Sequence, residues 1–104
     1  MSGPALTVGR GVVAEVARLA ALEVPDVLRV SRGGPPWLAR LAGSPVGVRR
    51  HGDVVDLRLW VVARPGSDLP AAAAHVRSVV AAAVAQLLGL RVGTVTVVVD
   101  GVGG

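Results

Sequence analysis

The sequence predicts an α+β fold in which two helices cover one face of a small mixed sheet of three to four strands. Segments 11–24 and 70–88 place apolar residues at steps of three and four, the spacing of an amphipathic helix. Valine-rich runs with a period of two, typical of half-buried strands, lie between and after them. The expected order is β-α-β-β-β-α-β. Because each helix has one apolar face, both can lie on the same side of the sheet, as a two-layer sandwich.

The helix ends carry sequence signals of their own. Pro25 ends the first helix, because the residue before a proline is disfavoured in the α region. Either Ser67 or Asp68 can cap the second helix, and Gly89 follows its last turn. The apolar stripe of the first helix is Val12, Val13, Val16, Leu19 and Ala20, and that of the second is Val76, Val79, Val80, Ala83, Val84, Leu87 and Leu88.

Five segments are expected to be strands: 5–8, 26–31, 46–50, 53–63 and 91–100. The third and fourth flank a His-Gly turn, which indicates a β-hairpin. The Gly- and Pro-rich segment 32–45 is expected to be a loop with one turn of helix at 37–42, and the tail 101–104 is expected to fray.

The strand at 53–63 has two different faces. One carries Val55, Leu57, Leu59 and Val61, and the other carries Val54, Asp56, Arg58, Trp60 and Val62. With both helices on one side, the second face is open and Trp60 points out of it. We interpret Asp56, Arg58 and Trp60 as a candidate interaction surface, because Trp is enriched at binding hot spots. The alternative is that Trp60 closes one end of the core.

Composition indicates one domain with a surplus of small apolar residues. The chain has 104 residues, 52% of them hydrophobic, including 23 Val and 16 Ala. This surplus suggests that some apolar surface meets a partner, although a compact alanine-rich fold would explain it equally well. The longest uncharged helical stretch, 78–90, is shorter than the roughly 20 residues of a membrane span. We expect no membrane span, no signal peptide, and a location in the cytoplasm or at the inner face of the membrane.

A basic segment lies between Asp26 and Asp53, which have no acidic residue between them. It contains Arg29, Arg32, Arg40, Arg49 and Arg50. These arginines are either a solvated loop rim or a surface for anionic lipid, an acidic partner or nucleic acid. Nucleic acid is disfavoured, though not excluded, because few aromatic residues are available to stack on bases. Trp37 is a candidate contact in the same segment, unless its ring folds the loop onto the sheet.

No arrangement of residues predicts catalysis. Neither His51 nor His75 neighbours a carboxylate or a second His in sequence at metal-ligand spacing, and Asp53 and Asp56 point to opposite faces of a strand. The Gly-Arg-Gly at 9–11 lacks the known phosphate-binding patterns. We expect a protein that is not an enzyme and that holds no metal or cofactor.

Three stretches, read in order, resemble a known family. They are VARLAALEVPDVLRVS at 16–31, GDVVDLRLWVVA at 52–63 and LPAAAAHVRSVVAAAVAQLLGLRVGTVTVVVDGV at 69–102. Together they resemble the alkaline shock protein family, the envelope stress response proteins of Gram-positive bacteria, over about residues 6–102. The resemblance implies a small cytoplasmic, non-enzymatic protein that self-associates and is held near the membrane by a separate integral-membrane partner. The alternative function is a small basic protein that binds nucleic acid or anionic lipid through the arginines of residues 29–50.

Overall fold

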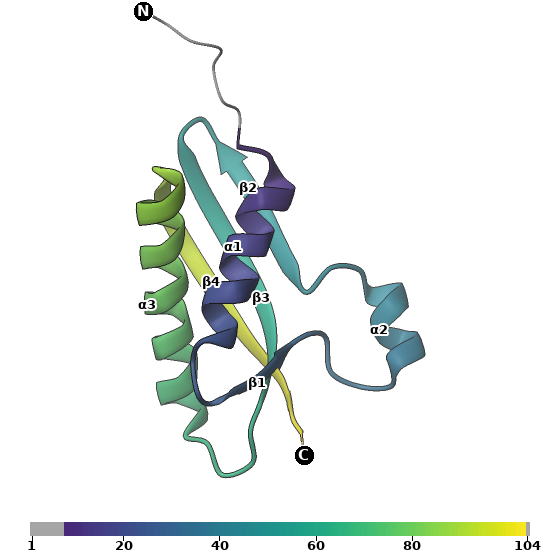
Figure 1. The fold of residues 1–104 in the computed structure, drawn as a ribbon. Coiled ribbons are helices and arrows are strands. Elements are labelled where there is room, and N and C mark those ends of the chain that lie inside the picture. The colour runs from purple at the N-terminus through teal and green to yellow at the C-terminus, as the bar shows by residue number, and fades with distance from the viewer. Residues whose placement is uncertain (1–7, 104) are drawn as a thin grey trace, which may run out of the picture.

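The computed structural model describes residues 8–103, which form three helices and one four-stranded sheet (Figure 1). The helices are α1 (Arg10–Leu22), α2 (Pro36–Ala42) and α3 (Leu69–Leu88). The strands are β1 (Val27–Val30), β2 (Val46–His51), β3 (Val54–Ala63) and β4 (Arg91–Val102). The predicted α+β class is confirmed. The strand expected at 5–8 lies outside the described residues except for Val8, which is not in a strand.

Strand β3 is the centre of the sheet and is longer than β1 or β2. β1 and β2 both pair antiparallel with β3, β1 beside residues 61–63 and β2 beside residues 54–59. β4 runs parallel to β3 and pairs with it from Val54 to Ala63. The sheet is therefore mixed, as predicted.

The predicted hairpin joins β2 to β3. His51 pairs with Val54, which leaves Gly52 and Asp53 as a two-residue turn. Gly52 has φ 63°, in the left-handed region that glycine adopts without steric cost.

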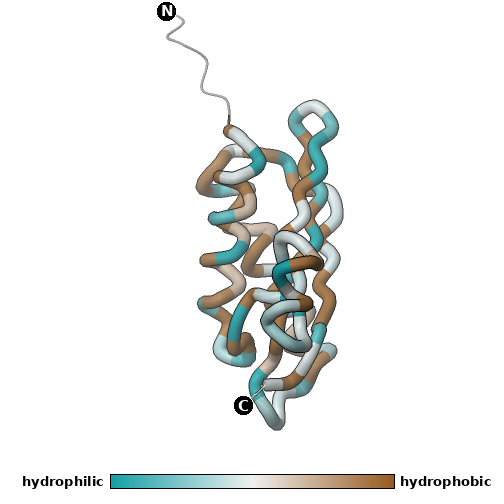
Figure 2. The backbone as a smooth tube through the Cα atoms, turned by 90° about the vertical axis from the view of Figure 1, so that its right-hand side faces the viewer, coloured by the Kyte–Doolittle hydropathy of each residue, from teal (hydrophilic) through white to brown (hydrophobic). Residues whose placement is uncertain are grey.

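Helices α1 and α3 lie side by side on one face of the sheet, as predicted (Figure 1). Beneath them are four buried residues on the helix-facing side of β3: Val55, Leu57, Leu59 and Val61. The helices contribute mainly Ala and Val to this core: Val13, Ala17, Ala20 and Ala21 from α1, and Ala72, Val76, Val80 and Val84 from α3. Such small side chains let the helices approach the sheet closely. Hydrophobic residues recur along both layers, as Figure 2 shows from the side.

The ends of α3 follow the sequence signals. The Asp68 carboxylate accepts a hydrogen bond from the Ala71 N–H at 3.2 Å, so Asp68 rather than Ser67 is the cap. At the other end Gly89 is left-handed, and its N–H donates to the Ala85 carbonyl at 3.0 Å.

Among the described residues, α3 is long and apolar enough to cross a membrane by length and composition alone. The uncharged stretch 78–90 covers only part of this helix, because α3 continues through Arg77 and His75 to Leu69, close to the start predicted at residue 70. A helix that packs one face against a domain core passes the same test, and α3 does pack against the sheet.

The end of β4 also departs from expectation. Residues 101 and 102 belong to the strand, and the Gly103 N–H donates to the Ala63 carbonyl at 3.0 Å. The frayed tail expected at 101–104 is therefore wrong for 101–103, because backbone pairing to β3 continues there, past an irregularity in the register between Val61 and Ala63. Residue 104 lies outside the described part.

Candidate interaction surface

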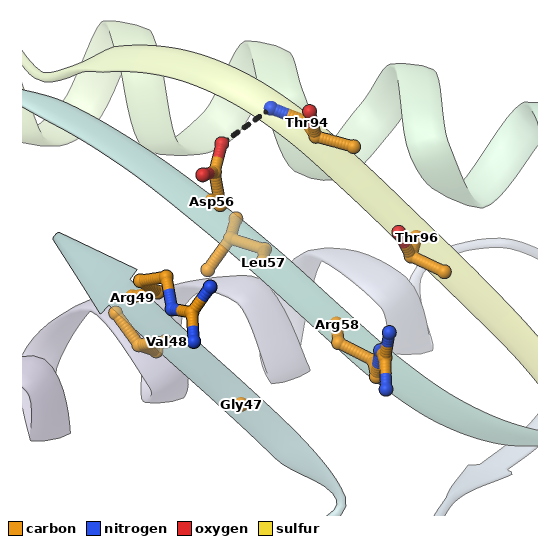
Figure 3. A pocket seen from close by; sticks show the side chains of 8 residues that line it. All are labelled: Gly47, Val48, Arg49, Asp56, Leu57, Arg58, Thr94 and Thr96. Carbon is orange, nitrogen blue, oxygen red and sulfur yellow. Dashed lines mark hydrogen bonds between the residues drawn. The ribbon is translucent and has the colours of Figure 1, made fainter. Parts of the chain in front are cut away.

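The face of the sheet opposite the helices carries an open hollow of about 440 Å³ (Figure 3). Cross-strand pairing sets its composition, because residues paired side by side point to the same face. Arg49 of β2 lies opposite Asp56 of β3, and Thr96 of β4 lies beside Arg58. The residues that shape the hollow are Gly47, Arg49, Asp56, Arg58, Thr94 and Thr96. In Figure 3 the helices pass behind the strands, on the other side of the sheet.

The carboxylate of Asp56 has an internal role. One oxygen accepts a hydrogen bond from the Thr94 N–H at 2.8 Å, where the register of β4 shifts by one residue (Figure 3). The other oxygen lies 3.7 Å from Nε2 of His51. Sequence spacing did not place a carboxylate near either histidine, and for His51 that is wrong, because hairpin pairing brings Asp56 beside it. The Asp56 carboxylate therefore already contacts groups of its own chain, without any partner protein.

Trp60 is half-buried, and a residue of the same chain covers it. The guanidinium carbon of Arg32, in the loop after β1, lies 3.6 Å from the centre of the Trp60 ring, and that of Arg58 lies 5.8 Å from it. Both distances permit a cation–π interaction. Trp60 thus neither closes the helix-side core nor projects freely.

The same loop closes one end of this face. The Gly33 N–H donates to the Asp100 carboxylate at 2.8 Å. Val62, an outward residue of β3, is only 2% exposed, with Leu28 and Gly103 beside it. The sequence predicted that this face is open along the whole sheet, and that prediction is wrong at the Val62 end. At the other end, around Arg58, the face is open.

The five arginines of the basic segment do not form one patch. In the strand register Arg29 lies opposite Val62 and Arg49 lies opposite Asp56, so both arginines are on the open face. Arg32 joins them there, over the Trp60 ring. Arg50 instead faces the helix side, where it donates to the Val8 carbonyl. Arg40 lies apart, on α2. We use the name basic sheet face for the set Arg29, Arg32, Arg49 and Arg58.

Helix α2 projects from the edge of the sheet that carries β1 and β2 (Figure 1). Trp37 is 65% exposed and Leu41 is 78% exposed, with Leu38 exposed between them. The alternative in which the Trp37 ring folds the loop onto the sheet is therefore wrong. The sequence did not single out the two leucines, because a seven-residue helix is too short to show a period.

A second hollow, of about 270 Å³, lies between α1 and α3 on the side away from the sheet. It is lined by Val16, Leu19, Ala20, Glu23, Ala83 and Leu87, and we call it the helix groove. Leu19 and Leu87 are 50% and 72% exposed. Both were expected to point into the core, together with Val12, which is also exposed. The apolar stripes are wider than the sheet can cover.

No group of three His, Cys, Asp or Glu side chains within residues 8–103 is placed to hold a metal ion. His75 is exposed on α3. That the protein is not an enzyme stays a prediction.

Solved structures share this fold at low sequence identity. The manganese form of a MamM CTD variant is 19% identical, with a TM-score of 0.58, covering 89% of this chain and 99% of that chain. The zinc form of another variant is 18% identical, with a TM-score of 0.59, covering 90% of this chain and 87% of that chain. The copper form of a third variant is 18% identical, with a TM-score of 0.59, covering 89% of this chain and 98% of that chain. At this identity the likeness concerns the fold alone.

The sequence itself gives the family. No curated protein sequence matches the chain. A family model, described as having a cell envelope-related function, matches residues 4–103, which is nearly the whole chain and includes the resemblance seen over about residues 6–102. The chain therefore belongs to the alkaline shock protein family, a family of cell envelope-related function.

Proposed function

We propose that this protein is a non-enzymatic interaction protein of the envelope stress response. On this proposal it works at the cytoplasmic side of the membrane, binds an acidic segment of a membrane-anchored partner, and self-associates. Membership of the family supports the link to the cell envelope. The observation that carries the proposal is the basic sheet face, which no described helix covers around Arg58.

The charge of this face argues for an acidic occupant. Four arginines lie on it, and the carboxylate in the hollow, Asp56, is already bonded to Thr94. A carboxylate-rich segment would neutralise the guanidinium groups and pair with them in bidentate geometry.

Self-association belongs to a different surface on this proposal. Two copies meeting through the basic sheet face would bring like charges together, which costs binding energy. The helix groove is flanked by the uncharged side chains of Leu19 and Leu87, and a second copy would bury these against their counterparts. We therefore assign self-association to the helix groove and partner binding to the sheet.

Partner binding is tested with Arg58→Glu. An oligo-glutamate peptide serves as a defined probe, and detergent-extracted membrane proteins from a native host serve as the second. We expect at least a tenfold loss of peptide affinity, together with loss of the membrane-protein band. Arg77→Glu, an exposed arginine on α3, is the matched control and should bind like wild type. Equal binding by the two variants would overturn the proposal.

Self-association is tested by sedimentation equilibrium. Leu87→Glu should shift the protein toward monomer, whereas Ala74→Glu, at an exposed position on the same helix, should leave the distribution unchanged. A wild-type protein that stays monomeric up to high concentration would remove this part of the proposal and leave partner binding standing.

The alternative of nucleic-acid binding has less support. Only three of the basic-segment arginines share the sheet face, and of the two tryptophans only Trp37 is freely exposed. Salt-titrated binding to duplex and single-stranded DNA measures it directly, since phosphate contacts give a steep salt dependence.

A further inference from the structure

The projecting helix α2 exposes a small apolar surface that neither proposed interface uses. Trp37 and Leu41 are one turn apart, and Leu38 lies 100° around the helix from Trp37, so the three side chains share one side. Arg40 stands next to this side, in the last turn. A folded domain rarely exposes a Trp and two Leu together without an occupant for them.

The charge around α2 selects the kind of occupant. No acidic residue occurs between Asp26 and Asp53, so the whole excursion that carries α2 is free of carboxylates. Arg40 is exposed on the helix itself. Trp is a residue type that concentrates at membrane–water interfaces, where its ring lies among headgroups. Arginines near the surface are attracted to anionic lipid.

We propose that α2 is a membrane-surface anchor whose occupant is an anionic lipid bilayer. Trp37, Leu38 and Leu41 enter the headgroup region, and Arg40 binds lipid phosphates. The proposal uses α2 alone, so it stands or falls separately from partner binding through the sheet.

Membrane binding through such an anchor is weak and reversible. Three apolar side chains bury far less area than a spanning helix, and stable membrane attachment takes two signals. α2 would supply one, orienting the domain with its β1–β2 edge toward the lipid (Figure 1).

The experiment is co-sedimentation with vesicles of phosphatidylcholine, and of phosphatidylcholine with phosphatidylglycerol at 7:3. Wild type should pellet with the anionic vesicles and not with the neutral ones, with a blue shift of tryptophan emission. The double variant Trp37→Ala, Leu41→Ser should lose at least tenfold in affinity and lose the shift. Val12→Ser, which replaces an exposed apolar residue on α1 outside the helix groove, is the control and should bind within twofold of wild type. Arg40→Glu should weaken binding in low salt, and inorganic phosphate should not compete.

Several results would overturn the proposal. These are absence of wild-type binding to the anionic vesicles, equal binding to neutral vesicles, wild-type binding by the double variant, or competition by inorganic phosphate. The double variant changes only exposed side chains, so an unaltered circular dichroism spectrum and urea midpoint show that it is folded. If it instead changes only the sedimentation-equilibrium distribution, α2 contacts a second copy rather than lipid.

Discussion

The two faces of β3 are stabilised in different ways. On the helix side, Val55, Leu57, Leu59 and Val61 are almost fully buried under α1 and α3. On the other side, Asp56 bonds to the Thr94 backbone and Trp60 lies under Arg32. The first face is held by non-directional packing and is complete. The second is held by single contacts and still exposes Arg58, so it is the one able to accept a partner.

The largest expected effect is on the packed face. Leu59 is 0% exposed, and Leu59→Ala should lower the free energy of unfolding by about 2–5 kcal/mol, because it leaves a cavity beneath both helices. Urea denaturation measures this change. Arg58→Ala, one residue earlier and on the open face, should stay within about 0.5 kcal/mol of wild type. Similar losses from the two variants would contradict the division between the faces.

An intermediate effect is expected where β4 approaches Asp56. A Cβ added at Gly93 would lie 2.5 Å from the Asp56 carboxylate oxygen and 3.1 Å from Val54. Gly93→Ala should therefore displace the carboxylate from the Thr94 N–H and cost about 1–3 kcal/mol in urea denaturation.

Gly47→Ala is the matched control on the neighbouring strand. A Cβ there meets Arg58 at 3.8 Å, an ordinary contact, so the variant should be neutral or slightly stabilising. If Gly93→Ala is equally harmless, the Asp56–Thr94 bond contributes nothing to the sheet.

The sequence predicted the helices and strands in which apolar residues recur with a regular period. The alternation in 53–63 assigned each residue to its face, since a strand has a period of two. The helical stripes identified α1 and α3, but they were wider than the sheet, so Leu19 and Leu87 were wrongly expected in the core. The absence of acidic residues along 27–52 indicated a basic segment. It did not show that the strand places Arg49 and Arg50 on opposite faces of the sheet.

The loop contacts could not be predicted, because they join residues far apart in the chain through single bonds. Arg32 over Trp60 and Gly33 bonded to Asp100 have no local signal. The projection of α2 is equally hidden, since a Gly- and Pro-rich segment with a Trp fits both a docked and a projecting helix. These are also the contacts that decide how much of the open face is available.

The smallest effect is expected on the outer surface of the helix layer, where Glu15 and Arg18 are both exposed to solvent. Arg18 donates to Glu15 through Nε at 3.2 Å and also through its terminal nitrogen. This hydrogen bond, and to a lesser degree the charge of Arg18, lowers the pKa of Glu15. A lowered pKa in the folded state means that the stabilisation is present above the unfolded pKa and is lost as pH falls through the folded value. Glu15→Gln should therefore fall slightly below wild type in urea midpoint near neutral pH and converge with it in acid. The gap should shrink in 1 M salt, because both side chains are exposed and screened. A gap that persists in acid or in high salt would mean that Glu15 acts through packing, as the helix-facing residues of β3 do, and not through its charge.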